Sequence, residues 1–286
     1  MARRSRRRTS KTSSTTGTTS TESTASQSST TSRSTTRRST TRKTRRVDTD
    51  RWVSSHIDTL IERLGLDTLP LKQDELQTIL TKIVDMLRGD AATINIDTIV
   101  RRFHRNLEEM YKIIAVSILE LRDELDPETL EFVVNNIGDH VLAFAPRLYR
   151  EAKKYGRDDL VERLRAEWAR AWITHKKIAL PVQCPKCGFN SLMPDLSCVV
   201  CGASTDEKEL KEYLGFEKLL REFVELYPRE DVEKAIKYGY VLLNSMGIKP
   251  PTAQREPLDI EIVLSSSEIE LLKSLLQGQS NEHSTN

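Results

Sequence analysis

The amino-acid sequence predicts a mainly α-helical protein, in which a multi-helix body is interrupted by a small metal-binding module and preceded by a disordered basic segment. Three observations predict this architecture. Between about residues 50 and 280, apolar residues recur mostly at spacings of three and four, as on one face of a helix. All four cysteines lie in two Cys-x-x-Cys pairs within the body. The first 46 residues contain 27 Ser or Thr and no Leu, Ile, Val or Phe.

The N-terminal segment, residues 1–46, is strongly basic. It has 13 Lys or Arg and one acid, a net charge of +12, so residues 47–286 carry −10 of the chain's total of +2. The segment buries too little apolar surface to offset its ordering entropy, and we expect it to be disordered. Its cations would contact nucleic-acid phosphates without reading base sequence. The candidate contacts are Arg37, Arg38, Arg42, Lys43, Arg45 and Arg46.

Three helices are predicted before residue 126. The first runs from about residue 50 to Gly65, a residue typical of helix C-caps. The second covers residues 76–87 and stops before Gly89. Over residues 99–125 the apolar positions continue at steps of three and four, which predicts the longest helix of the chain, in the centre of the core.

The next helices have recognisable start and stop signals. Asp126 and Pro127 supply an N-cap and an N1 proline for a helix that we expect to extend through Val141. Pro146 is expected to interrupt the helical structure before a short basic helix over residues 147–155. A longer helix is predicted over residues 158–177, and it carries two tryptophans, which the helical spacing assigns to the core: Trp168 and Trp172.

The region after the cysteines is predicted to be helical with one strand. Ser204 and Glu207 form a capping-box pattern for a helix that reaches about Tyr227. Pro228 predicts the start of another helix, ending at Gly247. The remaining elements are a strand over residues 258–264, where apolar residues alternate, and a last helix over residues 267–276.

The cysteines form the most specific chemical signal. Two Cys-x-x-Cys-Gly turns, ten residues apart, can direct four thiolates at one metal ion, and the glycine relieves the crowded backbone after the second ligand. Four thiolates leave no open position for water, so the ion would be structural. Zinc is expected, although four thiolates also suit iron. The predicted ligands are Cys184, Cys187, Cys198 and Cys201.

Residues 182–203 resemble the zinc-ribbon module, which is built from two such cysteine knuckles. The resemblance implies one structural zinc ion, but modules of this kind contact nucleic acid, contact protein or only order the chain. Here the module would either fix the angle between the helical sections or contact a partner through residues 189–196. The expected division is a tail over 1–46, a helical domain over 47–180, the ribbon over 181–203 and a C-terminal helical section over 204–286.

A second basic region lies just before the ribbon. Residues 147–177 contain 10 basic and 5 acidic side chains, which favours a phosphate-contacting surface as much as an ordinary solvated face. Its candidate contacts are Arg147, Arg150, Lys153, Lys154, Lys176 and Lys177, with Lys186 as an extension. A smaller cluster, Arg101, Arg102, His104 and Arg105, is interpreted as surface charge balancing Glu108 and Glu109.

The sequence lacks the common signatures of catalysis. It contains no Gly-x-x-x-x-Gly-Lys-Ser/Thr loop, no Gly-x-Ser-x-Gly and no His-Glu-x-x-His, and its five histidines are scattered. We therefore expect a protein that is not an enzyme and has no small-molecule substrate. The sequence has no apolar run of the roughly 18 residues needed to span a bilayer, and no secretory signal is evident. We therefore expect an intracellular protein, in the cytoplasm, nucleoid or nucleus, without a membrane partner.

Two functional hypotheses follow. The first is a zinc-binding protein that associates with DNA or RNA through its basic segment, within a replication, transcription or ribosome-associated complex. The second is a protein-assembly adaptor with purely structural zinc, whose tail docks on an acidic protein partner.

Overall fold

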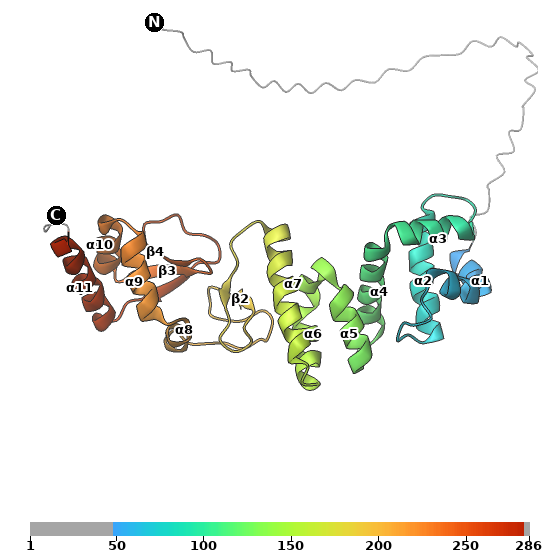
Figure 1. The fold of residues 1–286 in the computed structure, drawn as a ribbon, viewed down its shortest axis with the longest axis horizontal. Helices are drawn as coiled ribbons and strands as arrows, with labels where there is room; N and C mark the ends of the chain where they lie inside the picture. The colour runs from blue at the N-terminus through green and yellow to red at the C-terminus, as the bar shows by residue number, and fades with distance from the viewer. Residues whose placement is uncertain (1–47, 283–286) are drawn as a thin grey trace, which may run out of the picture. The chain divides into compact units, whose positions relative to one another are not determined.

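The computed structural model describes residues 48–282 (Figure 1). In this part of the chain, eleven α-helices and one short 3-10 helix are accompanied by a two-stranded and a three-stranded sheet. The prediction of a mainly helical fold is confirmed. The segment predicted to be disordered, residues 1–46, lies outside the described residues. No helix of the described part is long and apolar enough to cross a lipid bilayer.

The first three helices pack on one another. They are α1 (Thr49–Leu64), α2 (Gln73–Arg88) and α3 (Ile96–Arg105). As predicted, α1 ends at Gly65, which adopts a left-handed conformation with φ 68°. At the start of α2 one half of a capping box is present, because the Glu75 carboxylate accepts from the Lys72 backbone N–H at 2.8 Å. The helices bury their apolar faces against one another, including Leu60, Ile83 and Phe103.

The prediction of a single long helix over residues 99–125 is wrong. The chain leaves helical geometry at Asn106, with φ −120° and ψ 38°, and α4 (Leu107–Leu121) begins immediately after it. The Asn106 side chain donates to the Arg102 carbonyl at 2.9 Å, an alternative to the helical ladder that asparagine often provides. The apolar spacing continues across the break because both helices bury residues in the same core, for example Phe103 and Ile114.

Helix α5 (Pro127–Asn136) begins as predicted but ends early. The Asp126 carboxylate accepts from the Thr129 backbone N–H at 2.9 Å, which confirms the N-cap. The helix does not reach Val141, because the 3-10 helix η1 (Gly138–His140) follows it and Gly138 has φ 55°. A positive φ is incompatible with a continuing right-handed helix and favours glycine.

The prediction that Pro146 interrupts the helix is wrong. Helix α6 (Val141–Lys154) contains it, and α7 (Asp158–Lys176) follows after a short turn. A proline removes one main-chain hydrogen bond, but here its neighbours Ala145 and Leu148 are fully buried against the adjacent helices and stabilise the helix on both sides. The longest α-helix of the described part is α7, with 19 residues. Its tryptophans are buried, as predicted.

Arg122, just after α4, holds three segments together. Its guanidinium donates to both Glu75 carboxylate oxygens at 2.7 Å and to the Pro70 carbonyl at 2.8 Å. It also donates to Thr129 Oγ1 at 2.8 Å and to Asp126 Oδ2 at 3.1 Å. The Arg122 and Glu75 side chains are only 15% and 13% exposed. The start of α2 is thereby fixed to the start of α5.

E75Q is expected to destabilise the protein by about 2 kcal/mol, because it removes a charge-assisted, poorly hydrated ion pair. The hydrogen bonds from Arg122 hold the Glu75 pKa below its ordinary value. The pair therefore stabilises the fold fully above the unfolded pKa of about 4.3, and this contribution disappears as the pH falls through the lowered folded pKa. Urea unfolding should show that the difference in free energy of unfolding between E75Q and wild type is smaller at pH 3 than at pH 7. D74N, in the same exposed turn, is the control, and an equal loss there would contradict the prediction.

The C-terminal section differs most from its prediction. The cap of α8 (Glu207–Leu214) is Asp206, which accepts from the Glu209 N–H at 2.7 Å, and not Ser204. The helix predicted to reach Tyr227 is two helices, because Gly215 takes a left-handed conformation with φ 63°. The second of these is α9 (Phe216–Leu226), and α10 (Arg229–Tyr238) follows Pro228 as predicted.

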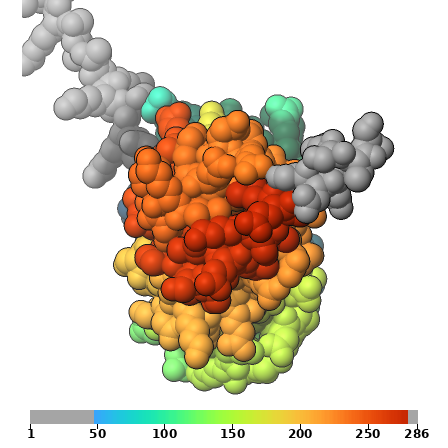
Figure 2. All heavy atoms as spheres, turned by 90° about the vertical axis from the view of Figure 1, so that its left-hand side faces the viewer, coloured from blue at the N-terminus to red at the C-terminus, as the bar shows by residue number. Residues whose placement is uncertain are grey.

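Residues 240–244 form a strand where a helix was predicted. Helix α10 ends at Gly239 with φ 74°, and β3 (Tyr240–Asn244) pairs antiparallel with β4 (Gly247–Lys249) and β5 (Ile260–Val263). The strand is buried on both faces, so its sequence lacks the alternation that would have identified it. Helix α11 (Ser266–Glu282) closes the section and contacts α9 and α10, crossing the face shown in Figure 2.

Nearly all buried apolar residues of the described body belong to one hydrophobic core cluster. It extends from Val53 in α1 through Phe189 in the cysteine module to Leu272 in α11. The described residues, 48–282, also group as one compact unit. The predicted division of the body into a helical domain, a ribbon and a C-terminal section stays a prediction.

Candidate metal centre

The four cysteines predicted as ligands come together. Their Sγ atoms all lie within 4.8 Å of one another. Cys184 Sγ is 3.9 Å from Cys201 Sγ, and Cys187 Sγ is 3.6 Å from Cys198 Sγ. In a tetrahedral site with bonds of about 2.3 Å, neighbouring sulfurs are about 3.8 Å apart. Two of the sulfur pairs have this separation and the others lie within 4.8 Å, so the cluster is compatible with one metal ion held by four thiolates.

The two cysteine knuckles have the same backbone design. Gly188 N–H donates to the Cys184 carbonyl at 2.8 Å, and Gly202 N–H donates to the Cys198 carbonyl at 2.9 Å. Both glycines have positive φ, 74° and 72°, as the predicted role of a glycine after the second ligand requires. Strands β1 (Val182–Gln183) and β2 (Asn190–Leu192) pair antiparallel beside the first knuckle. Each pair of sulfurs is thus presented by a rigid turn.

Hydrogen bonds and burial give the thiols of the cluster different pKa values. Cys198 Sγ accepts from the Cys187 thiol, from Ser191 Oγ at 3.1 Å and from the Cys201 N–H at 3.4 Å, which lowers its pKa to about 4. Donating to Cys198 raises the pKa of the Cys187 thiol. Burial raises the pKa of Cys184 to about 11. Metal binding would therefore begin with one thiolate in place and release protons from the other ligands.

The cysteine module packs on the α6–α7 pair through Phe189. This side chain is fully buried, and its ring meets the Tyr149 and Trp168 rings edge-on at 5.8 and 6.3 Å. The Trp168 indole N–H donates to the Asn190 carbonyl at 3.0 Å. Phe189, in the segment that the sequence offered as a partner contact, therefore packs on helices of the same chain.

Arg165 of α7 fixes the first knuckle. Its Nε donates to the Cys187 carbonyl at 2.8 Å, and its guanidinium lies over the Phe189 ring at 6.0 Å. A Cβ atom at Gly188 would lie only 2.9 Å from Arg165 Cζ. Glycine is thus required at this position both by its φ and by the close approach of α7. Spacing along the sequence gave no sign of this contact, because Arg165 is 22 residues away from Cys187.

The second helical section is attached to the other side of the first knuckle. Lys186, which was considered an extension of the basic patch, forms an ion pair with Glu209 of α8. Glu209 also accepts from Thr205 Oγ1 at 2.8 Å. The Tyr213 hydroxyl donates to Gln183 Oε1 at 3.0 Å. The module therefore contacts the helices that precede it and the helix that follows it.

Ser191 is a site residue that the sequence did not reveal. Its side chain is fully buried, and its hydroxyl lies 3.1 Å from Cys198 Sγ and 3.4 Å from the Phe189 carbonyl. Serine is too common in this chain to be singled out by type, and its role depends on the pairing that brings β2 beside the second knuckle. Hydrogen bonds of this kind orient a ligand and adjust its basicity.

S191A is expected to weaken metal binding about 10-fold or more, because the Cys198 thiolate loses a hydrogen-bond donor in a buried site. Competition with a chromophoric chelator measures the affinity, and Co²⁺ absorption reports the thiolate environment. S197A, at a half-buried serine beside Cys198, is the matched control. Equal affinities for wild type and S191A would contradict the prediction.

Two arginines of the predicted basic patch have different environments. Arg147 donates to the Leu119 carbonyl at 2.6 Å and to the Arg122 carbonyl, so it satisfies the C-terminal end of α4. Arg150 is exposed and forms no ion pair with any described residue. The structure thus assigns Arg147 a packing role and leaves Arg150 accessible.

The lysines of the patch are split between two places. Lys153 pairs with Asp158 at 2.9 Å, and Lys154 pairs with Glu124 at 3.4 Å. Both lie at the end of α6, beside the start of α7. The other two, Lys176 and Lys177, lie at the far end of α7, which at 19 residues is about 28 Å long.

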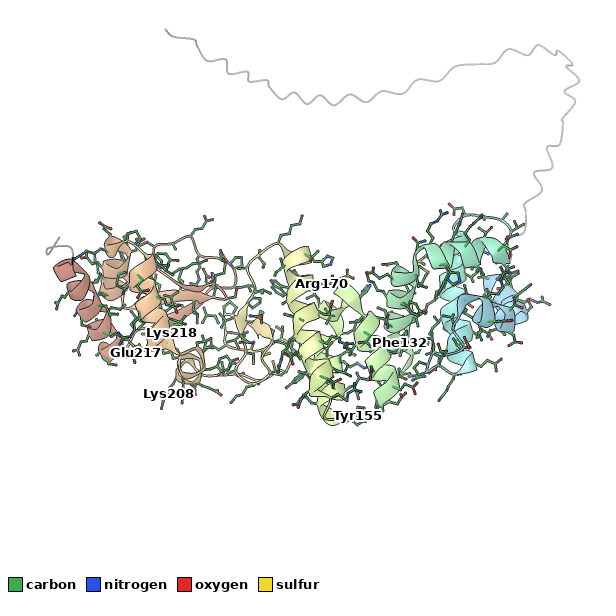
Figure 3. All side chains as sticks on the ribbon, viewed as in Figure 1. Phe132, Tyr155, Arg170, Lys208, Glu217 and Lys218 are labelled. Atoms are coloured by element: carbon green, nitrogen blue, oxygen red, sulfur yellow. The ribbon has the colours of Figure 1, made fainter. Side chains whose placement is uncertain are left out.

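Figure 3 labels one residue near each end of this helix pair, Tyr155 just after α6 and Arg170 in the second half of α7. The candidates over residues 147–177 therefore do not form one continuous patch, and their contact with nucleic acid stays a prediction. The candidates in the tail lie outside the described residues.

Fold and site together define a mainly helical protein with a buried four-cysteine cluster that could hold a metal ion. No protein-family model, no curated protein and no solved structure matches the chain.

Proposed function

We propose that this chain is a non-enzymatic, zinc-ordered helical protein that associates with nucleic acid through its basic N-terminal segment. The observation that carries the proposal is the division of charge, +12 over residues 1–46 against −10 over the rest. A basic segment on an acidic body attracts polyanions while the body itself resists non-specific collapse onto them. The contacts would be to phosphates, so binding would depend strongly on salt and weakly on base sequence.

In this proposal the metal is zinc, and its role is structural. Four thiolates satisfy a tetrahedral ion and leave no position for a reacting water. The side chains around the cluster support the same role, because Phe189 and Arg165 attach it to α6 and α7 while Lys186 attaches it to α8. The ion would fix the connection between the two helical sections.

The test is a salt titration of binding to generic duplex DNA and to RNA. Six phosphate contacts would reduce the affinity of the full chain about 10³-fold between 50 and 200 mM salt. The variant combining R37Q, R38Q, R42Q, K43Q, R45Q and R46Q, and a chain starting at Val47, should both lose most of this slope. Circular dichroism and metal content must remain unchanged in both. Absence of binding by the full chain would overturn the proposal.

The assembly adaptor is the second candidate, and the same division of charge supports it, because a segment with a net charge of +12 attracts acidic protein surfaces as well as phosphates. In this alternative the tail docks on an acidic protein. Binding to poly-glutamate without binding to DNA or RNA would favour the adaptor, whereas a preference for nucleic acid at equal charge concentration would exclude it.

A further inference from the structure

Helix α3 carries four basic residues, and two of them satisfy the ends of other helices. The Arg102 guanidinium donates to the Leu87 carbonyl in the last turn of α2. His104 Nε2 lies 3.1 Å from the Arg63 carbonyl in the last turn of α1. Both contacts satisfy main-chain carbonyls that have no partner within their own helix. Arg102 and His104 therefore have structural roles.

The other two basic residues of α3 point away from the core. Arg101 and Arg105 are four residues apart, on the side of the helix opposite the buried Ile99 and Phe103. Both are exposed, and neither forms an ion pair or hydrogen bond with a described residue. We call these two arginines the outer face of α3.

No acidic neighbour accounts for this outer face. The interpretation that α3 balances Glu108 and Glu109 is wrong, because those carboxylates pair with Lys112 at 2.8 and 3.8 Å. The one acid within α3, Asp97, pairs with Arg63 at 2.7 Å. The outer face is thus an exposed positive site on a body whose net charge is negative.

The start of α1 and helix α3 both contact the last turns of α2. Thr49, the first residue of α1, donates through Oγ1 to the Asp85 carboxylate at 2.5 Å, and Arg102 of α3 donates to Leu87. Both Asp85 and Leu87 are in the last turns of α2. The described chain begins at Asp48, and the basic segment precedes it in the sequence. The start of α1 and α3 therefore contact the same end of one helix.

We infer that the outer face of α3 is a second phosphate-binding surface, which engages the same nucleic-acid backbone as the N-terminal segment. The inference rests on the proposed function and assigns part of it to the folded body. Two guanidinium groups on a rigid helix would hold the body in a defined position on the nucleic-acid backbone. Neither arginine would read bases.

The test uses the full chain with R101Q and R105Q combined, in a salt titration on generic duplex DNA. Loss of two phosphate contacts should reduce the slope of log K against log salt by about two, and weaken binding at low salt. The variant with R101K and R105K keeps the charges and should retain the slope. R221Q combined with R229Q, in α9 and α10, removes the same charge elsewhere and should leave the slope unchanged.

The outcomes separate this inference from the proposed function. If the full chain binds and the R101Q/R105Q variant keeps the wild-type slope, the second surface is disproved while the role of the tail stands. If the tail variant loses only part of the slope of log K against log salt, and adding R101Q/R105Q to it removes the rest, both the proposed function and the second surface are supported. If the full chain binds no nucleic acid, both fail. Thermal unfolding of R101Q/R105Q should match wild type, because these side chains make no contacts with the described body.

Discussion

C198S is expected to abolish stoichiometric metal binding and to unfold the cysteine module. Metal binding contributes about 10–16 kcal/mol to the folding of small structural zinc sites at neutral pH, and the loss of one of four thiolates removes most of it. Cys198 is the cluster's best acceptor, with hydrogen bonds from the Cys187 thiol, Ser191 and the Cys201 N–H. Metal content per chain and thermal unfolding with and without chelator measure both effects.

V199S is the matched control for C198S. Val199 is the next residue in the same knuckle, it is 44% exposed, and its side chain contributes no ligand. The control should keep one metal ion per chain and its thermal transition. C198S that binds one ion with an unchanged transition would refute a four-thiolate site. Chelation of the wild-type protein should reproduce the C198S transition if the ion, and not the cysteine side chain itself, stabilises the module.

F189A is expected to destabilise the protein by about 3–5 kcal/mol, the cost of truncating a fully buried aromatic side chain. The Phe189 ring is the only large side chain of the module that meets aromatic rings of both α6 and α7 among the described residues, through Tyr149 and Trp168. Its loss also leaves Arg165 without the ring that its guanidinium covers. Urea unfolding followed by circular dichroism gives the free energy of unfolding.

Two further variants serve as controls for F189A. F189L nearly conserves volume and should cost less than about 2 kcal/mol. V199A changes an exposed apolar residue of the same module and should stay within about 0.5 kcal/mol of wild type. A loss below about 1 kcal/mol for F189A would show that the module does not depend on its contact with the helices. Metal affinity measured in parallel shows whether docking and metal binding are coupled.

Local sequence signals predicted several elements correctly. Gly65 ends α1, the Asp126 cap starts α5, and the apolar spacing places Trp168 in the core. These signals succeed because capping and helical periodicity involve residues within one or two turns of each other. The cysteine ligands were predictable for a similar reason, since two short turns contain all four.

The errors arose where a local pattern had more than one outcome. The apolar spacing continued through Asn106 because α3 and α4 share a core, although the backbone breaks there. The pattern of Tyr240–Asn244 predicts helix, because a strand buried on both faces has no alternation to identify it. Pro146 predicts a helix break, but packing on both sides of it stabilises α6.

By itself, the sequence determined the helical class of the protein, the four cysteines of the metal site and the separation of charge between the tail and the body. Each of these depends on composition or on residues close together in the chain. Only the tertiary structure decided that the Ser191 hydroxyl lies beside the Cys198 sulfur, that Arg147 satisfies the end of α4, and that the outer face of α3 has no acidic partner among the described residues. These depend on which side chains meet across elements, and a buried polar group or a surface charge acquires its role only from such neighbours.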